Sequence, residues 1–176
     1  MINQENIITS NNDITKAGGI IIDLSSMPAM KPSSLDGLLV AIRGISKRLI
    51  PILLKDGLGR VKNLHRLGKN HPIQGLIVDL EDVSGLHATS CLPKIGRSII
   101  ESKIDKNECP TFISIPWEAN SKDLLIARGC GASGIITQIV KEPKEKATQF
   151  HKELRAWLEE LGIDSVEKIG RKHLRA

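Results

Sequence analysis

Residues 49–82 read LIPILLKDGLGRVKNLHRLGKNHPIQGLIVDLED, and this stretch decides the fold. Its two ends, residues 49–57 and 75–82, are short aliphatic runs that predict buried strands. Residues 59–69, between them, are expected to form a helix. Two strands that are apolar throughout and are separated by a helix predict parallel neighbours joined by a right-handed crossover.

The same alternation extends in both directions along the chain. Five βα steps are too few for a complete eight-stranded barrel. The residue pattern therefore leaves two architectures open, a doubly wound open sheet and part of a barrel, because both use the same βαβ unit. Further strands are predicted at 18–26, 111–117 and 131–140, and further helices at 33–48, 92–104, 122–129 and 144–161.

Composition predicts one domain with an aliphatic core. The chain has 176 residues, of which 40% are hydrophobic, and it contains two Trp, two Phe and no Tyr. This length suits a single core built from Ile, Leu, Val and Ala. Residues 1–17 are polar, and we expect them to form a loose tail or to add a first strand. The βα-repeat domain is expected to span residues 18–176.

Charge and cysteine content argue against a nucleic-acid-binding, a disulfide-stabilised or a zinc-binding protein. The net charge is +5, but Lys and Arg are interspersed with Asp and Glu, which favours a solvated basic surface over a nucleic-acid-binding one. Cys91, Cys109 and Cys130 lie roughly twenty residues apart, a spacing that suits neither a disulfide framework nor a zinc site. No apolar run is long enough to span a bilayer, and the N-terminus has no signal-peptide core. We therefore expect a cytoplasmic protein without a metal site.

Polar residues follow each predicted strand, where parallel α/β folds carry their chemistry. Lys55 ends an apolar strand, so it is either a surface lysine or a cation for a substrate carboxylate or a flavin ring. Residues 81–90 combine acids, a histidine and hydroxyls, which suit acid–base work or, more simply, the capping of the next helix. The polar strand ends are 23–26, 55–57, 79–82, 114–120 and 137–138.

The C-terminal segment has a more specific pattern. A helix with an apolar face stops at Gly162, and a short helix restarts with Asp164 or Ser165 as its cap, before Gly170–Arg171. This resembles the end of the flavin-binding synthase domain of glutamate synthases. In that family, a helix ending in a Leu-Gly step precedes a short helix and a Gly-Arg pair.

The resemblance extends upstream and covers residues from about 33 to 174. It is carried by SLDGLLVAIRGI with IPILLKDGLG, by VDLEDVSGLHATS and by SKDLLIARGCGASGI. It implies the second half of a TIM-type barrel with C-terminal helices, FMN as cofactor, and glutamine-derived ammonia and 2-oxoglutarate as substrates. Lys55 and Asp82 match catalytic positions. Ser84, Thr89, Trp117 and Thr137 fall at flavin-side positions.

Two departures separate this chain from the family pattern. The family's paired glycines for the flavin phosphate fall on Pro116–Trp117, and its Gly-Thr-Gly turn falls near residues 138–140; bulky side chains there obstruct backbone approach to a phosphate. The cysteine-rich segment that holds the family's iron–sulfur cluster is missing, so we expect no such cluster.

Two functions stay open. One is an FMN-dependent oxidoreductase module of glutamate biosynthesis, completed by another chain. The other is a non-catalytic half-barrel for binding or assembly, which self-associates as a homo-oligomer.

Overall fold

The computed structural model describes residues 11–27, 31–46, 49–81, 88–137 and 143–174. Within them, five parallel strands form one sheet in the order β1-β2-β3-β4-β5. The predicted α/β fold of parallel strands alternating with helices is therefore confirmed. The strands are β1 (Ile20–Asp23), β2 (Ile52–Gly57), β3 (Gly75–Asp79), β4 (Thr111–Ile115) and β5 (Gly134–Thr137).

The helices fall where the apolar spacing predicts them, with one addition. Residues Asn11–Lys16 form α1, so the expectation of a loose tail or a first strand was wrong for this part of residues 1–17, because Ile14 packs into the core. None of the described helices is long and apolar enough to cross a membrane. The other helices are α2 (Pro32–Ser46), α3 (Val61–Asn70), α4 (Ala88–Ser102), α5 (Ser121–Gly129) and α6 (Pro143–Glu160), with 3₁₀ turns η1 (Leu58–Arg60), η2 (Val166–Lys168) and η3 (Arg171–Leu174).

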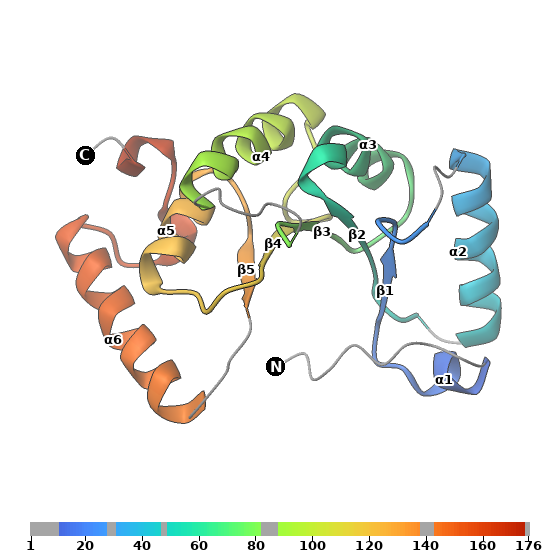
Figure 1. Cartoon of the computed structure of the whole chain (residues 1–176), viewed down its shortest axis with the longest axis horizontal. Coiled ribbons are helices and arrows are strands. Elements are labelled where there is room, and N and C mark those ends of the chain that lie inside the picture. Colours follow the sequence, from blue (N-terminus) through green and yellow to red (C-terminus); the bar gives the residue numbers. More distant parts are fainter. Residues whose placement is uncertain (1–10, 28–30, 47–48, 82–87, 138–142, 175–176) are drawn as a thin grey trace.

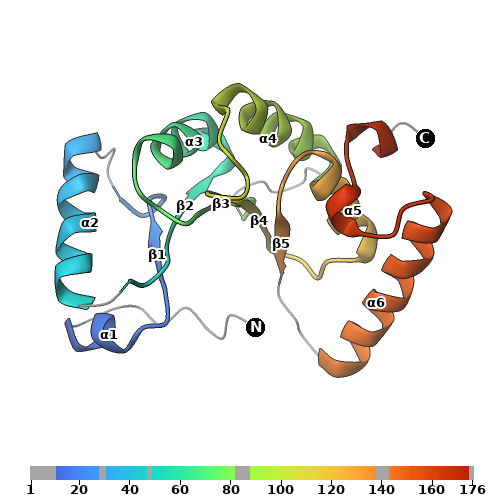
Figure 2. The same cartoon turned by 180° about the vertical axis from the view of Figure 1, so that it is seen from behind.

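The strand order excludes a doubly wound sheet. In a doubly wound sheet the strand order reverses at a switch point and helices cover both faces. Here every strand pairs with the next one in the chain. Right-handed crossovers then place the connecting helices on the same side, and Figures 1 and 2 show α2, α3, α4 and α5 along the outside of a curved sheet. We call the opposite face of the sheet the inner face.

The core lies between the sheet and these outer helices. Alternate strand residues point outward, and Ile52, Leu54, Leu76, Val78 and Ile113 are almost completely buried there. This follows from the period of two along a strand, since every second side chain meets the helices. The outward residues of β2 and β3 therefore anchor the sheet and leave the intervening residues on the inner face.

The inner face is partly apolar and largely shielded. Ile77 is buried between its register partners Lys55 on β2 and Phe112 on β4, and Phe112 and Leu53, which lies two residues before Lys55 on this face, are half-buried. The large apolar side chains that the described residues do expose lie elsewhere. They are Val40 on α2, Leu49, Ile100 on α4 and Leu174 in η3.

The C-terminal helices form a second, smaller cluster against α5. Leu125, Leu154 and Ile169 are its buried members. Helix α6 is terminated by Gly162, two residues beyond its last residue, whose φ of +67° is a left-handed conformation that glycine adopts without steric cost. The chain then restarts in η2 with Ser165 as the cap, its hydroxyl accepting the Glu167 N–H. The predicted helix, glycine stop and capped restart are therefore confirmed.

A close approach of α4 to the end of α5 depends on Gly96. A Cβ at this position would lie 2.6 Å from the carbonyl oxygen of Cys130, which is backbone and cannot rotate away. We expect Gly96→Ala to lower the free energy of unfolding by about 1–3 kcal/mol, the usual cost of overpacking. Urea unfolding followed by circular dichroism measures this difference.

The matched control is Gly44→Ala in α2, where no atom lies within 4 Å of the added Cβ apart from the adjoining residues and backbone of its own helix. Alanine has the higher helix propensity, so this variant should gain about 0.5–1 kcal/mol. Equal effects of the two substitutions would show that the approach of α4 to α5 is not tight.

Candidate functional site

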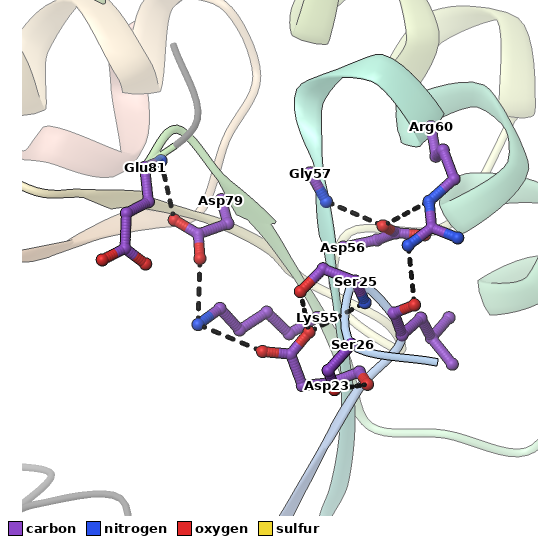
Figure 3. Close-up of polar contacts among 10 residues, drawn as sticks. Asp23, Ser25, Ser26, Lys55, Asp56, Gly57, Arg60, Asp79 and Glu81 are labelled. Carbon is purple, nitrogen blue, oxygen red and sulfur yellow. Dashed lines mark hydrogen bonds and ion pairs between the residues drawn. The ribbon is translucent and has the colours of Figure 1, made fainter. Parts of the chain in front are cut away.

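Lys55 lies on the inner face at the carboxyl end of β2. Its ammonium nitrogen Nζ is 2.9 Å from Oδ2 of Asp79 and 3.4 Å from Oδ2 of Asp23 (Figure 3). Only 9% of the residue is exposed. We call Asp23, Lys55 and Asp79 the Lys55 cluster. Lys55 is therefore a buried, paired lysine, and its interpretation as a surface lysine is wrong.

The strand register brings the Lys55 cluster together. Asp23 ends β1 and is the register partner of Lys55. Asp79 ends β3 and is the partner of Gly57, so it lies two residues further along the sheet on the same face as Lys55. Parallel strands end at the same edge of a sheet, and in such folds this edge carries the ligand site.

Asp23 is held ionised by its neighbours. Its Oδ1 accepts hydrogen bonds from the N–H of Ser25 at 2.9 Å and from the Ser25 hydroxyl at 2.5 Å. Burial by itself would raise the pKa of Asp23, but these hydrogen bonds and the Lys55 charge outweigh it and hold this pKa below its usual value. A carboxylate held in this way stays charged at neutral pH.

Asp79 uses both of its oxygens. Oδ2 pairs with Lys55, and Oδ1 accepts the N–H of Glu81 at 3.1 Å. Among the described residues the Lys55 cluster therefore holds one cation and two anions, a net charge of −1. The carboxylates can accept hydrogen bonds from hydroxyl, amide or amine groups, and the ammonium can donate one to an oxygen.

A second set of contacts fixes the backbone that carries Lys55. Asp56 points to the opposite face, is 1% exposed, and accepts hydrogen bonds from Gly57 N and Arg60 Nε, both at 2.8 Å. Arg60 also donates from Nη2 to the carbonyl of Leu24 at 2.6 Å, and Leu24 N donates to the Lys55 carbonyl at 2.8 Å. These bonds join the ends of β1 and β2 to η1, which leads into α3, and Figure 3 shows the contacts of Asp56 with Gly57 and Arg60.

Of the other predicted site residues, Trp117 and Thr137 are the ones whose side chains the structure describes, and their contacts lie after β4 and β5. Asp82 and Ser84 lie outside the described residues, and so does the side chain of Thr89. Trp117 follows β4 and packs against the core. Thr137 ends β5; its hydroxyl donates to the Trp117 carbonyl at 2.6 Å and accepts the Ala119 N–H at 2.9 Å.

The start of α5, where a phosphate would bind after β4, does not fit one. Asn120 and Asp123 form a reciprocal capping box, in which each side chain accepts the other residue's backbone N–H. The Ala119 N–H is taken by Thr137, and Glu118 adds a second carboxylate that pairs with Lys146. The N–H groups of Ala119, Asn120 and Asp123 are therefore engaged, and the acidic side chains at this helix start repel an anion.

A cavity of about 370 Å³ lies nearby, between β5, α5 and α6. Its wall includes Thr137, Phe150 and Leu124, and Lys55 does not line it. This cavity is therefore separate from the Lys55 cluster.

A second buried polar group lies among the outer helices. His65 on α3 is 1% exposed; its Nδ1 is 2.7 Å from Ser98 Oγ on α4 and its Nε2 is 3.2 Å from Thr111 Oγ1 on β4. Burial lowers the pKa of His65 to about 4. Because this histidine is enclosed on the helix side of the sheet, we interpret it as a neutral packing group.

The cysteines offer no reactive thiol or metal centre in the part of the chain that the structure describes. Cys91, Cys109 and Cys130 are free and buried. Burial raises the pKa of Cys109 to about 11 and also raises that of Cys130, so neither is a thiolate at neutral pH. Across the described ranges, no three His, Cys, Asp or Glu residues gather as metal ligands would.

Asp23 and Asp79 are the site residues that sequence reasoning did not select. Both stand at polar strand ends, yet nothing in the pattern singles them out from Asp56 or Asp82. The signal that could have found them is the alternation of side chains along a strand. Once the register of the parallel strands is known, Asp23 and Asp79 fall on the same face of the sheet as Lys55.

No protein-family model matches the chain, and no curated protein matches it significantly. The functional interpretation therefore depends on the residues of the chain and their geometry.

Proposed function

We propose that the chain is a divergent descendant of the flavin-binding synthase domain of glutamate synthases, and that it acts as a small-molecule-binding module. In this proposal the βα repeats form half of a TIM-type barrel. Strands that pair in chain order, with helices on one side only, are the arrangement that such barrels repeat. The C-terminal helix, glycine stop and capped restart are the features that carry the resemblance.

The observation that carries the proposal is the position of Lys55. The resemblance assigns an active-site lysine to this residue, and its side chain is buried on the inner face at the carboxyl end of β2. A buried lysine with two carboxylate partners is costly to keep for stability alone. Its retention at this edge of the sheet supports a binding site for a small polar molecule.

The contacts after β4 weigh against an FMN-dependent activity. Trp117 stands where the family places a glycine, and the capping box of α5 engages the N–H groups of Asn120 and Asp123 and sets a carboxylate at the helix start, which repels a flavin phosphate. The proposed module has therefore lost the phosphate side of the ancestral site and kept its substrate side. We derive no redox step for it.

An FMN-dependent oxidoreductase is the second candidate function, and the position of Lys55 favours it too.

Titration of FMN fluorescence with the purified protein separates the binding module from the oxidoreductase. We expect no saturable change at micromolar protein, and a colourless preparation. Riboflavin, which lacks the phosphate, is the control ligand. Saturable binding of FMN but not of riboflavin would mean that the protein has a binding site for the flavin phosphate, and would overturn the binding-module proposal.

The proposal includes a partner chain that covers the edges of the sheet. Within the described residues β1 and β5 each pair with one strand only, so each leaves a sheet edge. Unpaired edges are commonly covered by another chain or segment. A homo-oligomer, or a separate chain supplying the other barrel half, would cover them.

A further inference from the structure

Asp79 makes the shortest contact to the Lys55 ammonium among the described residues. The carboxylate oxygen Oδ2 lies 2.9 Å from Nζ, closer than the 3.4 Å of Asp23. The side chain of Asp79 is 11% exposed, whereas that of Asp23 is 35% exposed. Asp79 is therefore the less solvated and more tightly placed partner.

The contact has the chemistry of ligand recognition. A lysine at a strand end binds the carboxylate of a substrate through the same N–H···O geometry that Asp79 provides from within the chain. The other carboxylate oxygen of Asp79, Oδ1, accepts the Glu81 N–H at 3.1 Å, and this bond fixes the orientation in which Oδ2 meets Lys55. An external carboxylate would have to approach an ammonium that already faces two anions.

We propose that Asp79 is a specificity-determining residue: it occupies, on Lys55, the position that a substrate carboxylate would take. The inference depends on the proposed function, because it concerns the substrate of the same site. It follows that the site disfavours dicarboxylates such as 2-oxoglutarate. The net charge of −1 instead suits a small neutral or cationic molecule that presents amide, amine or hydroxyl hydrogens to Asp23 and Asp79.

The substitution Asp79→Asn tests this directly. Asparagine has nearly the same shape, and its amide oxygen can still accept the Glu81 N–H. It removes the negative charge that competes with a ligand carboxylate. Isothermal titration calorimetry with 2-oxoglutarate should show a dissociation constant for Asp79→Asn at least about tenfold lower than for the wild type.

Three further variants control the test. Asp79→Glu keeps the charge and should bind 2-oxoglutarate as weakly as the wild type, which a merely structural role of Asp79 would not require. Asp164→Asn removes a carboxylate from a surface pair with Lys168 and should leave binding unchanged. Asp23→Asn removes the more distant partner and should strengthen the binding of 2-oxoglutarate less than Asp79→Asn does. If Asp79→Asn fails to fold, Asp23→Asn takes its place: a gain in affinity for 2-oxoglutarate then supports the inference, and no gain overturns it.

The outcomes separate this inference from the proposed function. If Asp79→Asn binds 2-oxoglutarate no better than the wild type, or if Asp79→Glu gains as much, the inference is wrong even where no FMN binds. If FMN binds the wild type through its phosphate, the binding-module proposal is wrong, whether or not Asp79→Asn gains affinity. Tight binding of 2-oxoglutarate by the wild type would overturn the role of Asp79.

Discussion

Replacing Lys55 with methionine is expected to lower the free energy of unfolding by about 3 kcal/mol. Methionine keeps most of the side-chain volume but removes the charge that faces Asp23 and Asp79. Breaking a buried ion pair from one side costs about 3–5 kcal/mol, because it leaves the other charge buried and unpaired. The partial exposure of Asp23 places the expected loss at the lower end. Urea unfolding at neutral pH measures it.

The double variant Lys55→Met with Asp79→Asn supplies the internal control. Removing the nearer carboxylate together with the cation should recover a large part of the loss, so the two substitutions should be strongly non-additive. Lys62→Met is the surface control, since Lys62 pairs with Glu101 at an exposed position; it should cost less than about 1 kcal/mol. Equal costs for Lys55→Met and Lys62→Met would contradict the buried ion cluster.

The second large effect is a loss of stability in acid that is due to His65. Burial in the folded protein holds the pKa of this histidine at about 4, whereas the ordinary pKa of a histidine is 6.5. Between these two values the unfolded chain binds a proton that the folded chain does not, so stability falls as the pH falls from 6.5 towards 4. The shift of about 2.5 pH units corresponds to about 3 kcal/mol, fully present above pH 6.5.

The measurement compares urea unfolding of the wild type and His65→Gln between pH 7 and pH 4. Glutamine does not titrate but can still hydrogen-bond to Ser98 and Thr111. Carboxylates contribute to the acid sensitivity of both proteins, so the difference between the two curves isolates the histidine. If the two proteins lose stability in parallel, the side chain of His65 is not kept neutral by burial.

The sequence predicts the order and type of most elements because their periodicity is strong. The apolar runs around Ile52–Gly57 and Gly75–Asp79 are strands because both of their faces are shielded. Helix α1 escaped prediction, since it is short and polar and its one apolar residue, Ile14, makes no periodic pattern. The stop at Gly162 was predictable because a left-handed residue after a helix strongly favours glycine.

The candidate site could be predicted only in part. Lys55 stands out in the sequence because a charge ends an otherwise apolar strand. Its partners do not stand out, because an aspartate at a strand end is as typical of a solvated turn as of a site. Trp117 and Thr137 were selected through the resemblance, and the structure joins them to each other by a hydrogen bond.

By itself, the sequence determined that this chain alternates strands and helices, and that a cation stands at the end of β2. These are local properties, because side-chain period and capping act over a few residues. Only the tertiary structure decided that the strands pair in chain order and that Asp23, Lys55 and Asp79 share one face. Pairing and register are set by the packing of distant segments against a common core, and no local pattern in the chain encodes them uniquely.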